Sequence, residues 1–154
     1  MNPFMQEAIA LADRAVDGHL GGPFGAVVVK DGTIVGRGHN RVTSSNDPTA
    51  HAEIVAIREA CATLKTFHLE GAELYTTCEP CPMCMAAIYW AKIATVYYGN
   101  TREDAAAIGF ADQAIYDELA LPIDRRSVTM TPLMRDETIK AFQRWRHKSD
   151  KVMY

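Results

Sequence analysis

Hydrophobic residues recur with helical spacing in some segments of this chain and form β-branched runs in others, and the pattern changes at glycine, proline and polar clusters. Residues 3–17 carry apolar side chains at three- and four-residue spacing, the period of an amphipathic helix, and Gly18 is placed to end it. β-Branched runs at 25–30 and 33–38 then flank Asp31-Gly32, which is a strong signal for a β-hairpin. The first forty residues therefore predict a helix followed by a hairpin.

Helices and strands continue to alternate through the rest of the chain. A polar loop at 39–50 separates the hairpin from the next helical segment. Helical periodicity is expected over about 50–64, 80–91, 112–119 and 136–147, and strands over 72–77, 95–99 and 127–131. This alternation predicts an α/β protein, a three-layer α/β/α sandwich with a mixed central sheet.

The length of 154 residues favours one domain, because a chain of this size buries roughly 68–70% of its unfolded surface. No internal repeat, linker or low-complexity stretch divides the sequence. We therefore expect residues 1–154 to form a single domain.

Charge and cysteine usage narrow the function classes. The formal net charge is -3, and the basic residues near the C-terminus are interleaved with acidic ones, so nucleic acid is an unlikely partner. No apolar run approaches the ~18 residues that would span a membrane, and charged residues interrupt the N-terminal helix where a signal peptide would be apolar. We expect a cytoplasmic protein whose four cysteines stay reduced and include metal ligands.

Two short motifs carry the candidate chemistry: His51-Ala52-Glu53 and Pro80-Cys81-Pro82-Met83-Cys84. One imidazole and two thiolates give Zn²⁺ three protein ligands and leave its fourth tetrahedral position for water. Cys81 and Cys84 are three residues apart, so they share one helix face, and the helix start favours their thiolate forms. Glu53 is the expected catalytic residue, because activating water requires a proton carrier.

A structural metal site is the alternative. Cys78, Cys81 and Cys84 form C-x₂-C-x₂-C, which with His51 would close a Cys₃His zinc site in a non-enzymatic binding module. The same cysteines resemble part of an iron–sulfur motif, but its fourth cysteine is absent. Neither alternative explains Glu53, and the joint occurrence of H-x-E and P-C-x-x-C is typical of zinc-dependent nucleobase deaminases.

The resemblance extends beyond the metal motifs. The segments GGPFGAVVVKDG, SNDPTAHAE, CEPCPMCMAAIYWA and GFADQAIY, with the terminal tyrosine, resemble the small bacterial guanine deaminases of the cytidine/deoxycytidylate deaminase superfamily over nearly the whole chain. This resemblance implies a cytidine-deaminase-like fold and the conversion of guanine and water to xanthine and ammonia, by attack at C2 of the purine.

The resemblance also implies substrate contacts. Asn40 is expected to hydrogen-bond the purine, Asp112 to accept from the donor-rich edge of guanine, Phe24 and Trp90 to line the ring, and Tyr154 to close the site. Four of these five residues also have a simpler structural explanation. Asn40 would cap a loop, Asp112 would cap a helix, Trp90 would belong to the core, and Tyr154 would lie in a frayed end.

The resemblance further implies a homodimer in which the C-terminal segment, about residues 134–154 here, crosses over to the partner's pocket. The main rival is a tRNA-specific adenosine deaminase, which shares the fold and the metal motif but would predict a basic groove. Deaminases of another free base such as cytosine are a further alternative.

Overall fold

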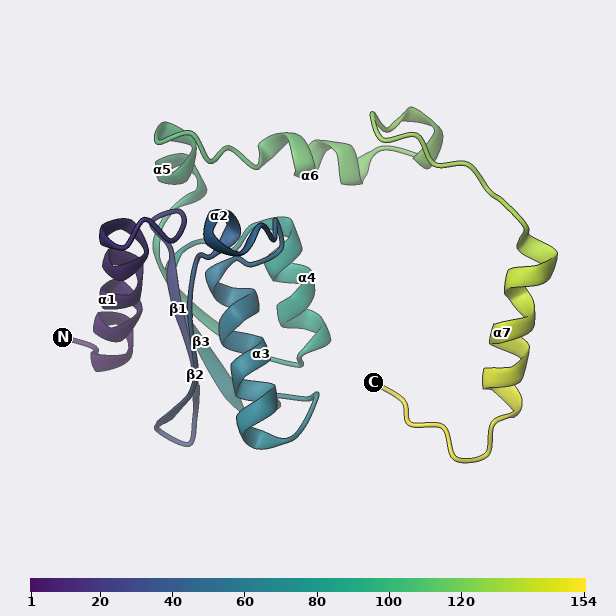
Figure 1. Ribbon diagram of the computed structural model, residues 1–154, viewed down its shortest axis with the longest axis horizontal. Coiled ribbons are helices and arrows are strands. Elements are labelled where there is room, and N and C mark those ends of the chain that lie inside the picture. Colours follow the sequence, from purple (N-terminus) through teal and green to yellow (C-terminus); the bar gives the residue numbers. More distant parts are fainter. The chain divides into compact units, whose positions relative to one another are not determined.

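The computed structural model describes all residues, 1–154, as two compact units, residues 1–112 and 113–154. A four-stranded mixed sheet forms the centre of the first unit (Figure 1). β1 is antiparallel to both β2 and β3, whereas β3 and β4 are parallel. In the order of the sheet, the strands are β2 (Thr33–His39), β1 (Gly25–Lys30), β3 (Ala72–Cys78) and β4 (Thr95–Asn100). The predicted mixed sheet is confirmed.

Strands β1 and β2 form the expected hairpin. Asp31 and Gly32 connect them with φ angles of 49° and 73°, as in a two-residue type I′ turn. Lys30 pairs with Thr33 across this turn. All but the last residue of β1 are buried, which accounts for its uninterrupted apolar run.

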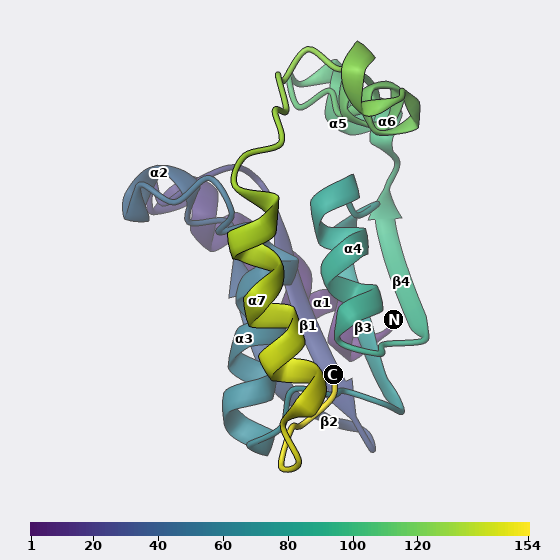
Figure 2. The same ribbon diagram turned by 90° about the vertical axis from the view of Figure 1, so that its right-hand side faces the viewer.

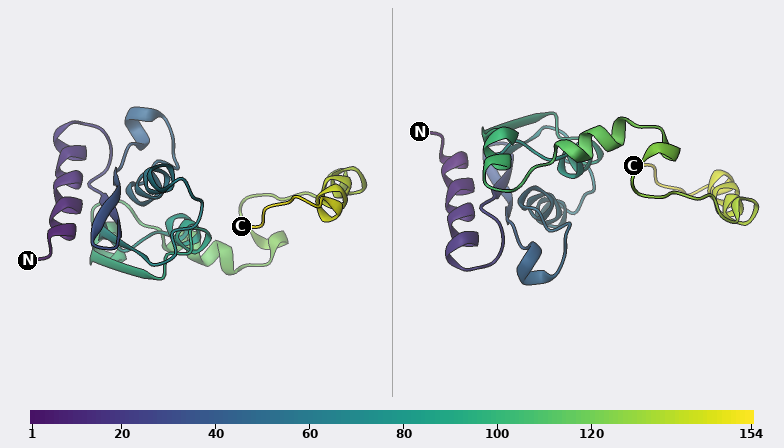
Figure 3. Two further views of the ribbon diagram at one scale, coloured as in Figure 1. Left: turned by 90° about the horizontal axis from the view of Figure 1, so that it is seen from below. Right: turned by 90° about the horizontal axis from the view of Figure 1, so that it is seen from above.

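Helices cover both faces of the sheet, so the predicted three-layer arrangement is confirmed (Figures 1 and 3). On one face, α1 (Pro3–Asp17) packs Leu11 against Val27, Val29 and Tyr75. On the other face, α3 (Ala52–Leu64) and α4 (Pro82–Trp90) lie side by side (Figure 2). They enclose a larger core whose members include Val28, Ile57, Leu74 and Ile88.

Two glycines let α3 lie very close to β2. A Cβ atom on Gly38 would lie 2.0 Å from the carbonyl oxygen of Ala52, and one on Gly36 would lie 2.2 Å from that of Ala56. Cβ atoms essentially never approach other heavy atoms within 3.0 Å. The depth at which the start of α3 sits on the sheet therefore depends on these positions having no side chain.

Two short helices, α2 (Val42–Ser45) and α5 (Arg102–Ala107), were not expected from the periodicity. Helix α5 begins with a capping box: the side chain of Thr101 accepts from the amide of Asp104 at 3.3 Å, and Asp104 Oδ2 accepts from the amide of Thr101 at 2.8 Å. The T-x-x-D pattern that forms this box is visible in the sequence and would have located the helix.

The second unit contains α6 (Gln113–Ala120), the short 3₁₀ helix η1 (Ile123–Arg125) and α7 (Arg135–His147). The strand expected at 127–131 is wrong: this segment forms no strand, because no neighbouring strand pairs with its backbone. No residue of 113–154 is buried. A single domain with an exchanged segment at about 134–154 stays a prediction.

None of the helices combines the length and the apolar character required to cross a membrane.

Candidate metal centre and base-binding site

The three expected metal ligands lie at the beginnings of two neighbouring helices. His51 is the N-cap residue of α3, and Cys81 is the N-cap residue of α4. Cys84 lies in the first turn of α4, where Pro82 is tolerated because its missing amide donor would have no helical partner. His51 and Cys81 therefore meet although thirty residues separate them in the sequence.

The distances between these ligands fit a zinc ion. His51 Nδ1 lies 3.6 Å from Sγ of Cys81 and 3.6 Å from Sγ of Cys84, and all three atoms lie within 4.8 Å of one another. Tetrahedral bonds of about 2.1 Å to nitrogen and about 2.3 Å to sulfur separate the two atoms by about 3.6 Å. The donor set and the spacing thus fit Zn²⁺ with one tetrahedral position left over.

Cys78 does not join this group. Its thiol lies 3.6 Å from the carbonyl oxygen of Thr101 and donates to it. Burial, followed by the nearby charge of Glu53, raises the pKa of Cys78 to about 11, and Asp112 adds to this effect. Cys78 is therefore a buried neutral thiol, and the residues that could hold a metal ion are His51, Cys81 and Cys84.

The hydrogen bonds among the three candidate ligands favour a thiolate on Cys81. Hydrogen bonding from Cys84, and then from His51, lowers the pKa of Cys81 to about 4. The hydrogen bond with Cys81 is also the main reason that the pKa of His51 is raised. The proton shared by the two thiols stays on Cys84, whose pKa is raised. A divalent cation replaces that proton and stabilises both thiolates.

Glu53 lies at the edge of the ligand group, in the first turn of α3 and with only 6% of its surface exposed. Its Oε2 atom is 3.4 Å from Sγ of Cys84, and its Oε1 atom is 3.4 Å from Oγ1 of Thr76. Burial is the main cause that raises the pKa of the Glu53 carboxyl. The buried carboxyl group therefore holds a proton more readily than a carboxyl group in water.

Asn40 and Phe24 lie together at the start of the hairpin. The amide of Asn40 donates to the carbonyl oxygen of Phe24 at 3.0 Å. The side-chain oxygen of Asn40 accepts from the amides of Gly22 and Val42, both at 3.1 Å. The buried side chain thus orders the loop through its oxygen, and its NH₂ group points away from these two loop amides. The loop-capping reading and the base-binding reading are both compatible with this geometry.

Phe110 joins Phe24 at this place, and the periodicity gave no signal for it. The two rings meet edge to face with their centroids 5.0 Å apart. Two residues further along, Asp112 lies 3.8 Å from the guanidinium of Arg102, with 16% of its side chain exposed. The backbone amide of Arg102 donates to Glu79 Oε2 at 3.1 Å, which ties this segment to the strand end that precedes Cys81.

Trp90 lies away from the candidate ligands. Trp90 is at the opposite end of α4 from the ligands, six residues or about 9 Å along the helix axis from Cys84, and it is 64% exposed. Tyr154 belongs to the second unit. Their roles at the substrate stay predictions, and the placement of Trp90 gives its predicted role no support.

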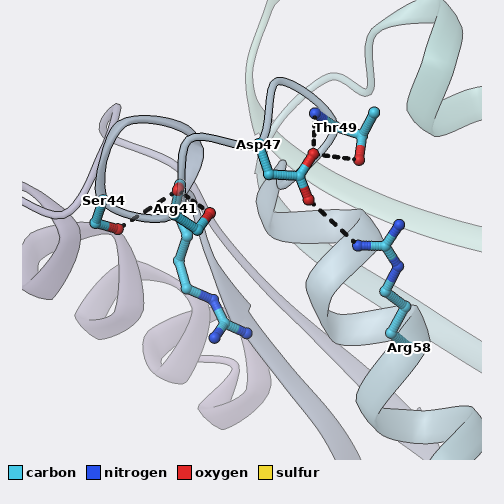
Figure 4. Close-up of polar contacts among 6 residues, drawn as sticks. Arg41, Ser44, Asp47, Thr49 and Arg58 are labelled. Atoms are coloured by element: carbon cyan, nitrogen blue, oxygen red, sulfur yellow. Dashed lines mark hydrogen bonds and ion pairs between the residues drawn. The ribbon is translucent and has the colours of Figure 1, made fainter.

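The loop that delivers His51 is held by its own polar contacts (Figure 4). Asp47 Oδ1 accepts from both the amide and the hydroxyl of Thr49, at 2.8 and 2.7 Å, and Arg58 lies 3.7 Å from the other oxygen. The side-chain hydrogen bond from Thr49 is the largest of the effects that lower the pKa of Asp47. These contacts fix the loop against α3 just before the metal ligand.

Comparison with known proteins agrees with this geometry. Residues 1–100 match the cytidine and deoxycytidylate deaminase zinc-binding region. The chain is 48% identical over 151 residues to the guanine deaminase of Bacillus subtilis (strain 168), covering 98% of this chain and 97% of that protein. The X-ray structure of Bacillus subtilis guanine deaminase matches with a TM-score of 0.95 and 47% identity, covering 100% of this chain and 99% of that one. A tRNA-specific adenosine deaminase of Aquifex aeolicus (strain VF5) is 47% identical over 96 residues, 62% of each chain.

Proposed function

Because this chain belongs to the cytidine and deoxycytidylate deaminase family, we propose that it is a zinc-dependent hydrolase that converts guanine and water to xanthine and ammonia. The observation that carries this proposal is the reach of the likeness to a guanine deaminase, which covers 98% of the chain. The likenesses to tRNA-specific adenosine deaminases cover 56–75% of the chain. The net charge of -3 also argues against a polyanionic substrate.

His51, Cys81 and Cys84 would hold the zinc ion. When bound, zinc lowers the pKa of water to about 7 and so supplies hydroxide at neutral pH. Glu53 takes a proton from the attacking water, delivers a proton to a ring nitrogen and passes one to the departing amine. One carboxyl group can serve all three steps because it lies beside the ligands, with Oε2 3.4 Å from Sγ of Cys84.

We propose that Asn40, Phe24 and Asp112 bind the base. The NH₂ group of Asn40 would donate to an acceptor of the purine ring, since its oxygen already accepts two backbone hydrogens. Phe24, backed by Phe110, would contact the ring, and the carboxylate of Asp112 would accept from guanine N–H groups. Adenine has an acceptor in place of a donor at N1, so it would face the partly buried carboxylate of Asp112 unfavourably and be discriminated against.

The decisive experiment is a substrate panel. Zinc-loaded protein is incubated with guanine, adenine, cytosine, guanosine and an adenosine-bearing tRNA anticodon stem-loop, and xanthine and ammonia are measured. We expect ammonia release from guanine with equimolar xanthine. Release only from the stem-loop would replace the proposal with tRNA editing, and release only from cytosine would replace it with another base deaminase.

We further propose that the protein acts as a homodimer in the cytoplasm, in purine metabolism, and that the segment of about 134–154 with Tyr154 closes the partner's pocket. The support is the lack of any buried residue in 113–154. Burying a large apolar side chain contributes about 1.5–3 kcal/mol, so this segment needs a surface to cover. The most exposed apolar residues of 113–154 have 61–80% of their surface exposed: Val128, Leu133, Phe142, Val152, Met153 and Tyr154. The free state of all four cysteines fits a reducing compartment.

Exchange can be tested with two inactive variants. One chain carries Glu53→Gln and the other lacks Tyr154; each is assayed alone and after the two are unfolded and refolded together. If the tail completes the partner's site, the mixture regains activity, because hybrid dimers pair an intact Glu53 with an intact tail. A mixture as inactive as its parts would show that no chain completes another.

A further inference from the structure

The side chain of Thr76 is placed on the catalytic face of the sheet. Ala72 and Leu74 belong to the core between the sheet and helices α3 and α4, and side chains alternate along a strand, so Thr76 points the same way. It is 1% exposed. Valine has nearly the same shape as threonine and would fill this space without a polar atom. Packing alone therefore does not explain the hydroxyl.

The hydroxyl meets one particular oxygen of the catalytic carboxyl group. Thr76 Oγ1 lies 3.4 Å from Oε1 of Glu53, whereas Oε2 of Glu53 lies 3.4 Å from Sγ of Cys84. The two oxygens thus have different surroundings: one faces the strand, and the other faces the metal ligands. The hydroxyl donates this hydrogen bond and Oε1 of Glu53 accepts it.

We propose that Thr76 is a positioning residue, whose hydroxyl anchors Oε1 of Glu53 so that Oε2 faces the reacting atoms. This inference rests on the proposed deaminase function. The terminal torsion of a glutamate side chain is broad and roughly two-fold, so a carboxylate without such an anchor would turn freely. A contact of 3.4 Å is near the outer limit for a hydrogen bond, and such catalytic contacts commonly shorten once substrate is bound.

The neighbouring Thr77 provides a matched control. It is also buried on β3, at 7% exposure, but its side chain points to the opposite face and accepts from the amide of Gly25 at 3.1 Å. Thr76→Val, Thr76→Ala, Thr76→Ser and Thr77→Val are compared with the wild type in zinc content, thermal stability, and kcat and KM for guanine. The alanine variant serves if the valine variant does not fold.

We expect Thr76→Val and Thr76→Ala to keep one zinc per chain and to lose about ten- to a hundredfold in kcat, the range implied by losing a hydrogen bond to a charged group. Their KM should stay within about threefold, because Thr76 touches the proton carrier and not the base. Thr76→Ser should recover most of kcat, and Thr77→Val should lose stability without this selective loss of kcat. Unchanged kcat in the valine and alanine variants, or a serine variant as slow as they are, would overturn the inference.

A readout independent of turnover separates this inference from the proposed function. In crystals of the zinc-loaded variants, the Glu53 carboxyl group should turn or lose order in Thr76→Val and Thr76→Ala and keep its orientation in Thr76→Ser. If the wild type releases no xanthine from guanine, the proposed function fails, and these crystals still decide the role of Thr76. An unchanged Glu53 in all three variants would refute it.

Discussion

Substituting Gly38 by alanine tests whether the close packing of α3 on β2 sets the geometry of the metal centre. The added Cβ atom would lie 2.0 Å from the carbonyl oxygen of Ala52, and the residues on either side of Ala52 are His51 and Glu53. Restoring a contact of 3.0 to 3.4 Å requires the start of α3 to move by about 1.0–1.4 Å. That movement would carry a metal ligand and the proton carrier together and would change their distances to Cys81 and Cys84.

Two effects of known size follow. Overpacking of this kind typically costs about 1–3 kcal/mol, which for a domain of this length lowers Tm by about 2–12 °C. A misplacement of about 1 Å at a catalytic group costs about a hundredfold in rate. We therefore expect Gly38→Ala to fold with a lowered Tm, to bind zinc more weakly, and to deaminate guanine about a hundredfold more slowly at full zinc loading.

Gly36→Ala is the matched control. Its Cβ would lie 2.2 Å from the carbonyl oxygen of Ala56, so the clash is of similar size but lies one helical turn further from His51. Calorimetry, metal analysis and steady-state kinetics on both variants separate the two effects. Equal losses of kcat at equal zinc content would mean that general loosening of the core, and not displacement of the site, explains the defect. Wild-type Tm and kcat in Gly38→Ala would refute the reasoning altogether.

Four further outcomes follow from the candidate ligands and Glu53. Glu53→Gln should keep zinc and the fold while turnover falls by about 10²–10⁴-fold, as for the loss of a general acid–base; substantial remaining activity would exclude Glu53 as the proton carrier. In metal-free protein, burial raises the folded-state pKa of Glu53. The contribution of protonated Glu53 to the free energy of unfolding is therefore complete below the unfolded pKa near 4.5 and is lost as pH rises through the folded-state pKa. Denaturant titrations of metal-free Glu53→Gln should not show this loss of stability with rising pH. After zinc removal, iodoacetamide at pH 7 should modify Cys81, with a pKa of about 4, well before Cys78, with a pKa of about 11. Cys78→Ser should bind zinc normally. If the Cys78→Ser protein bound no zinc, the Cys₃His alternative would be restored.

The parts of the fold that depend on local sequence were predictable. The Asp31-Gly32 hairpin needs only positive φ angles at the turn, and the C-x-x-C pair needs only the helical period. The pairing of the His51 and Cys81 motifs across thirty residues was also predictable, because together they form a known donor set.

What the sequence could not supply were relations between distant segments. The edge-to-face contact of Phe24 with Phe110 and the contact of Thr76 with Glu53 arise only when strands and helices are assembled. The segment 127–131 has the alternation typical of a strand, but a strand also needs a neighbour for its backbone, which local pattern does not reveal.

The zinc ligands come from two helix starts, and the intervening chain includes β3, which pairs with β1. His51 and Glu53 emerge from the ribosome before Cys81 and Cys84. The complete set of metal ligands forms only after Cys84 has emerged and β3 has paired with β1. Metal binding therefore requires residues 51–84 to be synthesised and β3 to be paired, and it then stabilises the two helix starts against each other. In cells short of zinc, the zinc-free protein should have a lower free energy of unfolding than the zinc-bound protein and should be degraded by proteases more rapidly.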